Sequence, residues 1–190
     1  SGWTALIRHS GLQLVPLYIR NSDIIHDGVL QVTEAMVNQQ NLKPSSEILT
    51  SYYFVNNLGP IYSDDYTITG RIMNPPTTLG SQPCGYCSVY VICEKGKHFF
   101  TIGDLGCSAV FKLGFSGLET MEANPDLTNF EFISNGWTSF ESVVSGNTVN
   151  IRVANANVYS YNKVNTLGRI MGIHIVFSGL GAIDQVKLFN

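Results

Sequence analysis

The fold is decided by residues 167–190, which read LGRIMGIHIVFSGLGAIDQVKLFN. In the first half of this stretch, apolar side chains recur at every second position, which is the period of a half-buried strand: Met171, Ile173, Ile175 and Phe177. The glycine-rich segment 178–181 interrupts the alternation, and glycine tolerates the positive φ of a tight turn. In the second half, Val186 and Leu188 are expected to point inward while Lys187 faces water. We therefore predict two strands that form a hairpin.

Strand patterns recur along the rest of the chain. Residues 65–73, DYTITGRIM, alternate between apolar and polar side chains. Residues 88–93, 98–103 and 107–113 are predicted to be consecutive antiparallel strands of a meander. Short strands separated by Gly, Asn and Pro turns, with no sustained helical period, indicate a β-sandwich or a barrel.

Length and composition indicate a single globular domain over residues 1–190. Hydrophobic residues make up 44% of the chain and charged residues only 13%, which excludes a disordered protein. The first part, residues 1–20, is expected to be an edge strand or an N-terminal arm. The reason is Pro16, which lacks the N–H that a central strand needs.

Charge and hydropathy exclude two classes of partner. The net charge of −3, with basic residues scattered along the chain, argues against a nucleic-acid partner. No apolar run reaches the roughly 18–20 residues that a membrane-spanning helix needs.

The chain begins at Ser1 rather than Met, so we expect that a leader or anchor has been removed. We therefore predict an extracellular, periplasmic or cell-surface location.

Four segments carry a resemblance to a known family. They are IIHDGVL at 24–30, DYTITGRI at 65–72, NGW with SGN at 135–147, and GIHIVF with GAIDQVKL at 172–188. In this order and spacing they resemble the concanavalin A-like lectin/glucanase superfamily, the laminin-G-like jelly rolls. The resemblance implies an all-β, two-sheet antiparallel jelly-roll β-sandwich with one concave sheet. It also implies ligands, often sugars, in the concave groove or at the rim loops.

Many members of that superfamily are hydrolases, and the laminarinase-type glucanases carry an E-x-D-x-E strand. Retaining hydrolysis needs two carboxyl groups about 5–5.5 Å apart, which alternate strand positions provide. This sequence has no E-x-D-x-E motif, so we expect a non-catalytic domain. The alternative is a glycoside hydrolase-like enzyme that acts on polysaccharide. Its carboxylates would be brought together only by the fold, and Asp65 and Glu131 are candidates.

No cofactor is predicted, although calcium and zinc are kept as alternatives. Laminin-G-like domains sometimes bind calcium, and carboxylates near predicted turns could supply its oxygen ligands: Asp23, Asp27, Asp64 and Asp104. Zinc is less favoured, because the chain has one C-x-x-C pair and no histidine spacing typical of zinc sites.

The sequence context of the cysteines favours a structural role over a redox role. Cys84 and Cys87 precede a predicted strand, whereas a thioredoxin-type C-x-x-C precedes a helix. In the predicted meander, Cys87 and Cys107 lie at the same end of the sheet, roughly 10 Å apart across one strand. Cys84 lies in a loop that could fold over this gap. The favoured disulfide is Cys84–Cys107, followed by Cys87–Cys107 and then Cys84–Cys87. A zinc site on these three thiols and a set of reduced cysteines are the alternatives.

Outward-facing polar and aromatic residues of the predicted strands are the candidate ligand-binding residues: Arg71, Tyr90, Asn150, Arg152 and His174. Sugars are bound by planar hydrogen-bonding groups and aromatic platforms, so this set is typical of a carbohydrate groove. The plain alternative is an ordinary solvated sheet face. We predict non-catalytic glycan binding within an exported or cell-surface protein. A protein is the other ligand class considered for this binding domain. The second alternative is a structural or sensory interaction ectodomain with no small ligand.

Overall fold

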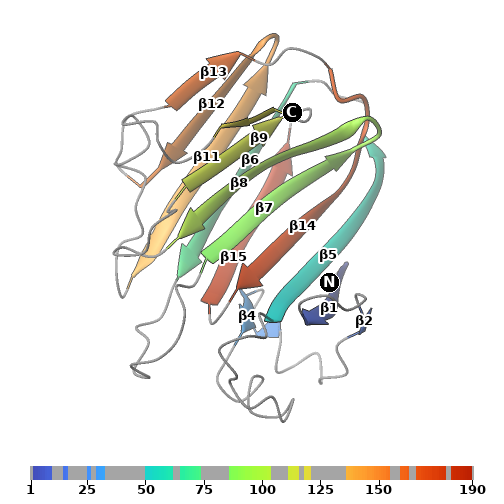
Figure 1. The fold of residues 1–190 in the computed structure, drawn as a ribbon, viewed down its shortest axis with the longest axis vertical. Coiled ribbons are helices and arrows are strands. Elements are labelled where there is room, and N and C mark those ends of the chain that lie inside the picture. The colour runs from blue at the N-terminus through green and yellow to red at the C-terminus, as the bar shows by residue number, and fades with distance from the viewer. Residues whose placement is uncertain are drawn as a thin grey trace.

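The structure is a computed structural model that describes residues 2–9, 15–16, 25–26, 29–32, 50–61, 65–73, 86–103, 111–115, 118–120, 136–154, 159–162, 166–178 and 181–189. These residues form two antiparallel sheets that stack face to face (Figure 1). The fold is therefore the all-β sandwich that the strand periodicity and the resemblance predict. No helix among the described residues has the length and apolar character to cross a membrane.

Sheet A contains eight of the described strands. They are β1 (Trp3–His9), β2 (Val15–Pro16), β5 (Thr50–Ile61), β7 (Tyr86–Cys93), β8 (Gly96–Gly103), β9 (Phe111–Phe115), β10 (Leu118–Thr120) and β14 (Ile170–Ser178). Their order across the sheet is β10-β9-β8-β7-β14-β5-β1-β2. The predicted meander is formed by β7, β8 and β9, and Pro16 lies in the edge strand β2 as its missing N–H requires.

Sheet B contains seven of the described strands. They are β3 (Ile25–His26), β4 (Val29–Val32), β6 (Tyr66–Met73), β11 (Trp137–Ser145), β12 (Thr148–Val153), β13 (Tyr159–Asn162) and β15 (Gly181–Phe189). Their order is β13-β12-β11-β6-β15-β4-β3. β11 and β12 form a tight hairpin, in which Ser145 pairs with Thr148 and Gly146 takes a φ of 53° between them.

The predicted hairpin at residues 167–190 is wrong in its pairing, although both strands are present. β14 lies in sheet A between β7 and β5, whereas β15 lies in sheet B between β6 and β4. Each strand buries one apolar face between the sheets, and Ile175 and Ile183 are both 0% exposed. Two strands with one apolar face each can stack across a core as well as pair within a sheet, and here they stack. The C-terminal stretch thus links the two layers of the sandwich.

The prediction for the face of Met171 is also wrong, and a bulge is the cause. Ile173, Ile175 and Phe177 are buried as predicted, but Met171 is 38% exposed and its neighbour Ile170 is 0% exposed. The register of β14 shifts between Ile170 and Gly172 against both neighbouring strands. An extra residue in a strand reverses the face of every residue beyond it.

The core between the sheets is apolar and includes a buried polar cluster among the described residues. His98 of β8 is 0% exposed. Its Nδ1 lies 3.0 Å from the hydroxyl oxygen of Tyr66 on β6, and its Nε2 lies 3.4 Å from the hydroxyl oxygen of Ser142 on β11. The imidazole of sheet A therefore hydrogen-bonds to two strands of sheet B, which satisfies polar groups that would otherwise be costly to bury.

Candidate functional site

The structure divides the predicted ligand-binding residues between the two outer faces of the sandwich. Tyr90 of β7 and His174 of β14 are directly opposite each other in sheet A. Arg71 of β6 and the β12 residues Asn150 and Arg152 belong to sheet B. A single site made of all five residues is therefore not formed, and each face has to be considered by itself.

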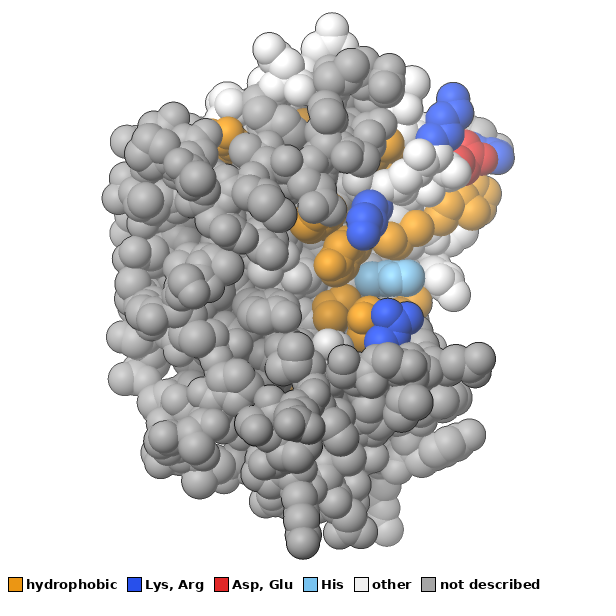
Figure 2. Space-filling view, viewed as in Figure 1, with side chains coloured by type: hydrophobic (Ala, Val, Ile, Leu, Met, Phe, Trp, Pro, Cys, Tyr) orange, Lys and Arg blue, Asp and Glu red, His pale blue; other side chains and the backbone are white. Residues whose placement is uncertain are grey.

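The described part of the outer face of sheet A is largely apolar, with basic side chains and a histidine among the apolar ones (Figure 2). The Tyr90 and Phe99 rings stack with centroids 5.2 Å apart. The Lys97 ammonium stands 5.0 Å from the Tyr90 ring centroid and 5.2 Å from that of Phe99. A cation over both rings occupies the surface on which a sugar would stack. In addition, Phe99 is only 8% exposed.

His174 lies in the middle of this face and is half-buried. The residues directly opposite it are Val55 on β5 and Tyr90 on β7, and neither is charged at neutral pH. Burial lowers the pKa of His174 below its ordinary value of 6.5, because the imidazolium loses hydration there. The neutral form of His174 is therefore favoured on this face.

The outer face of sheet B contains a row of polar side chains in register across four neighbouring strands. Arg152 of β12 is opposite Glu141 of β11, and Glu141 is opposite Thr69 of β6. Thr69 in turn is opposite Lys187 of β15. Residues opposite one another in a sheet point to the same side, so the row presents a guanidinium, a carboxylate, a hydroxyl and an ammonium group to one surface.

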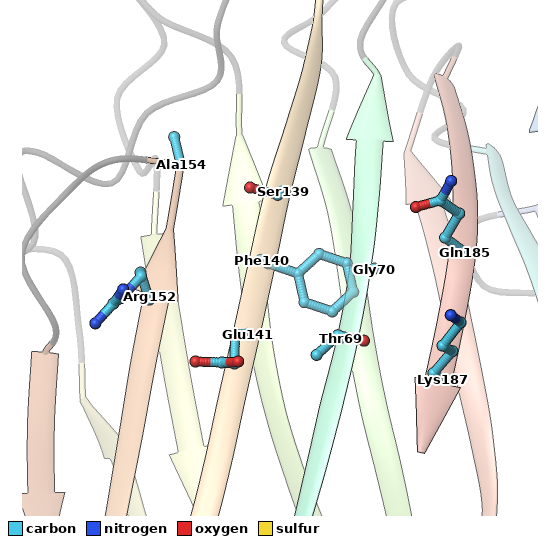
Figure 3. A pocket seen from close by; sticks show the side chains of 9 residues that line it. All are labelled: Thr69, Gly70, Ser139, Phe140, Glu141, Arg152, Ala154, Gln185 and Lys187. Atoms are coloured by element: carbon cyan, nitrogen blue, oxygen red, sulfur yellow. The ribbon is translucent and has the colours of Figure 1, made fainter. Parts of the chain in front are cut away.

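This row lines a pocket with a volume of about 420 Å³. Figure 3 shows its lining side chains, which come from the same four strands and from Ala154, the residue after β12: Thr69, Gly70, Ser139, Phe140, Glu141, Arg152, Ala154, Gln185 and Lys187. A Cβ on Gly70 would lie 2.6 Å from Cζ of Phe140, so the glycine leaves room for the buried phenylalanine ring below the pocket. The volume falls in the range of about 300–1,000 Å³ that is common for small-ligand pockets.

The charged groups of the pocket are available to a ligand. Arg152, Glu141 and Lys187 are exposed. Within the described part of the chain, none of the three takes part in an ion pair. Unpaired charged groups on adjacent strands are able to form charge-assisted hydrogen bonds with hydroxyl or acidic groups of a bound molecule.

Two strained backbone positions flank the pocket. Ala154 follows the end of β12 with a φ of 52°, and Gln185 lies in β15 with a φ of 53°. The register of β15 against β6 shifts between Asp184 and Lys187, so Gln185 belongs to a bulge. Left-handed backbone at a residue other than glycine costs about 1–3 kcal/mol and is concentrated at functional sites. The bulge re-aims the Gln185 side chain to the pocket rim (Figure 3).

Arg71, a predicted site residue, lies beside the pocket and is already engaged. Its Nε and Nη2 atoms donate hydrogen bonds to the same oxygen of Asp184, at 3.0 Å and 2.6 Å. Its guanidinium carbon also stands 4.6 Å from the centroid of the Trp137 ring. Arg71 therefore holds Asp184, the residue next to the bulge. The Trp137 ring packs at the outer face and supports the Arg71 guanidinium. Asn150 is similarly engaged, because its side-chain oxygen accepts a hydrogen bond of 2.5 Å from the Ser160 hydroxyl.

The structure addresses only part of the cysteine and metal predictions. Cys84 and Cys107, the carboxylates proposed for calcium, and Glu131 lie outside the described residues. Cys87 is a free, buried thiol, so neither disulfide alternative that uses Cys87 is formed. Burial raises the pKa of Cys87 well above its ordinary value, which makes the thiol unreactive. Asp65 is exposed and accepts a 2.7 Å hydrogen bond from the Gly146 amide, so it stabilises the β11–β12 turn.

Of the residues that line the pocket, sequence reasoning assigned Arg152 to a ligand site and missed the other polar members, among them Glu141, Gln185 and Lys187. Glu141 was detectable, because a charged residue next to the apolar Phe140 in a predicted strand has the outward parity, as the burial pattern of β11 shows. Counting outward from the Gly146 turn also places Glu141 opposite Arg152. Gln185 could not be assigned to the pocket, because its position depends on a bulge that no local pattern indicates.

Comparisons with known proteins agree with this architecture. No protein-family model matches the sequence, and no curated protein matches it. The carbohydrate-binding module CBM66 from Bacillus subtilis superposes with a TM-score of 0.51 at 12% identity, over 74% of this chain and 82% of that one. The galectin LEC-6 of Caenorhabditis elegans superposes with a TM-score of 0.43 at 18% identity, over 71% of this chain and 95% of that one. Toad ovary galectin, solved with thio-digalactose, superposes with a TM-score of 0.47 at 12% identity, over 72% of this chain and 97% of that one. At these identities only the fold is shown, and the chain shares the jelly-roll β-sandwich architecture of CBM66, whose TM-score exceeds 0.5.

Proposed function

We propose that the chain is a non-catalytic carbohydrate-binding domain that holds its glycan in the pocket on the outer face of sheet B. The observation that carries the proposal is the row of Arg152, Glu141, Thr69 and Lys187, which lines a hollow of about 420 Å³. Sugars present many hydroxyl groups, each of which donates and accepts hydrogen bonds. A guanidinium, a carboxylate and a hydroxyl side by side supply both kinds of partner.

The arrangement of carboxylates supports binding over hydrolysis. Among the described residues that line the pocket, Glu141 is the one carboxylate. The nearby Asp184 carboxylate accepts two hydrogen bonds from Arg71. Hydrolysis of a glycosidic bond uses a pair of carboxyl groups as acid and as base or nucleophile. A pocket with one unpaired carboxylate favours a role in which Glu141 accepts hydrogen bonds from the ligand.

The similarity in fold to a bacterial carbohydrate-binding module also supports the proposal. We extend the proposal to location, because a glycan-binding domain meets its ligand where glycans are displayed. The domain would then belong to an exported or cell-surface protein. Protease treatment of intact source cells tests this, since a surface protein is cleaved and an internal one is protected.

A glycan array and affinity electrophoresis in polysaccharide gels test the binding function. Arg152→Ala is expected to weaken binding by about 10- to 100-fold, because hydrogen bonds to charged groups contribute about 1.5–3 kcal/mol. The matched control is Arg8→Ala, which removes an exposed arginine that stands over Tyr53 on sheet A. The control is expected to bind like the wild type.

The reverse outcome contradicts the proposal. If Arg8→Ala or Tyr90→Ala abolishes glycan binding while Arg152→Ala leaves it intact, the ligand lies on sheet A. Release of reducing sugar from a bound polysaccharide that stops in Glu141→Gln would replace the binding function with an enzymatic one.

A further inference from the structure

We infer that the glycan held in the sheet B pocket carries a negative charge, as a carboxylate or as a sulfate ester. This inference rests on the proposed function and adds the chemical class of the sugar. It follows from the balance of charges around the pocket, where no carboxylate of the described residues faces the ammonium group of Lys187.

The described groups around Lys187 are uncharged or already paired. Across β6 the residue directly opposite is Thr69, and on the pocket side of β15 the preceding outward residue is Gln185. The nearest carboxylate along β15 is Asp184, whose Oδ2 accepts both hydrogen bonds from Arg71. Arg71 therefore neutralises Asp184, and the described residues leave Lys187 as an exposed, uncompensated cation.

Glu141 does not provide the missing charge. It is directly opposite Arg152 on the neighbouring strand, where the side chains of opposite residues are about 5 Å apart at their Cβ atoms. Lys187 is separated from Glu141 by the intervening strand β6, roughly 10 Å away in the sheet. The positive charge of Arg152 offsets Glu141 more closely than Lys187 does. Among the described residues that line the pocket there is therefore one positive charge in excess, and it lies at the Lys187 end.

The net charge of the whole chain is negative, so the local excess of positive charge would be the source of any preference for acidic saccharides. At a net charge of −3 the protein repels polyanions at long range. A preference for acidic saccharides would therefore have to come from local cations. Such a preference should also weaken as salt screens an exposed pair.

Paired saccharides that differ in charge test the inference. One pair is the oligogalacturonates and their methyl esters, and the other is dextran and dextran sulfate, each titrated calorimetrically at low salt. We expect the acidic member of at least one pair to bind about two- to fivefold more tightly, the size of an exposed ion pair. The first pair reports a carboxylate ligand and the second a sulfate ligand.

Three charge variants provide the controls. Lys187→Gln should bring the ratio of acidic to neutral affinity to about one, and Glu141→Gln should raise it. Lys95→Gln removes an exposed lysine in the turn between β7 and β8 and should leave the ratio unchanged. The two pocket variants have opposite expected signs, so a general loss of folding cannot imitate the result.

The outcomes separate this inference from the function on which it rests. Neutral saccharides that bind as tightly as the acidic ones, with a ratio that Lys187→Gln does not change, overturn the charged-ligand inference and leave glycan binding intact. If no saccharide of either kind binds, in these pairs or on the array, both proposals fail.

Discussion

Tyr52 shows how a single residue departs from the rule that buried polar groups are paired. Its side chain is 2% exposed, and its hydroxyl makes no hydrogen bond within the described part of the chain. The same burial raises the pKa of Tyr52 to about 12. An unpaired buried hydroxyl costs about 1–3 kcal/mol. We therefore expect Tyr52→Phe to raise the free energy of unfolding by about 1 kcal/mol in urea titrations. A loss of stability of that size would mean that the hydroxyl has a partner.

His174 predicts a pH dependence of stability. Its pKa is lowered in the folded protein because of burial, so the unfolded chain binds the proton more readily. The stability contribution is complete above the unfolded pKa near 6.5 and is lost as the pH falls through the lower folded pKa. Urea midpoints near pH 7.5 and pH 5 should therefore lie closer together in His174→Gln than in the wild type. If the two urea midpoints lie equally far apart in both proteins, other groups cause the loss of stability at acidic pH.

At the scale of elements, the bulge in β15 predicts a conflict between stability and binding. Glycine tolerates the φ of 53° at Gln185, so Gln185→Gly should keep or raise the free energy of unfolding. Lys187→Gly, two residues along the same strand, has no such strain to relieve and should lose about 1 kcal/mol. Gln185→Gly should nonetheless weaken glycan binding, because it removes an amide from the pocket rim. Equal losses of stability in both variants would contradict a strained Gln185.

Period-two patterning predicted most strands and their buried faces, and it failed where pairing is non-local. Ile173, Ile175 and Phe177 are buried as their spacing indicates. The partner sheets of β14 and β15 could not be derived, because an apolar face is satisfied equally by pairing within a sheet or stacking across a core. Met171 was misplaced for a related reason, since one extra residue in β14 leaves no local signal.

The candidate site was predictable in its chemistry and only partly in its location. Arg152 and Asn150 could be placed on an outward face from strand parity, and the β11–β12 turn sets Glu141 opposite Arg152. The neighbourhood of Thr69 and Lys187 depends on the pairing of β6 with β15, strands far apart in the sequence. The same limitation placed Tyr90 and His174 in one predicted groove with residues of the opposite sheet.

At the scale of the whole molecule, the two faces of the sandwich differ in what they offer a ligand. The core cluster of His98, Tyr66 and Ser142 joins the sheets through hydrogen bonds. On sheet A the stacked rings of Tyr90 and Phe99 have Lys97 over them, whereas sheet B presents charged groups around a pocket that form no ion pair among the described residues. A rigid sheet that positions such groups suits recognition of a polar ligand without movement of the backbone.

The most direct test of the account is a map of backbone amide chemical shifts during titration with a saccharide that the array identifies. Binding in the proposed pocket should shift the amides of Glu141, Arg152 and Gln185 most strongly. The amides of Tyr90 and His174, on the opposite face, should stay in place. Shifts that centre on Tyr90 and His174 would contradict the central claim and assign the glycan to sheet A.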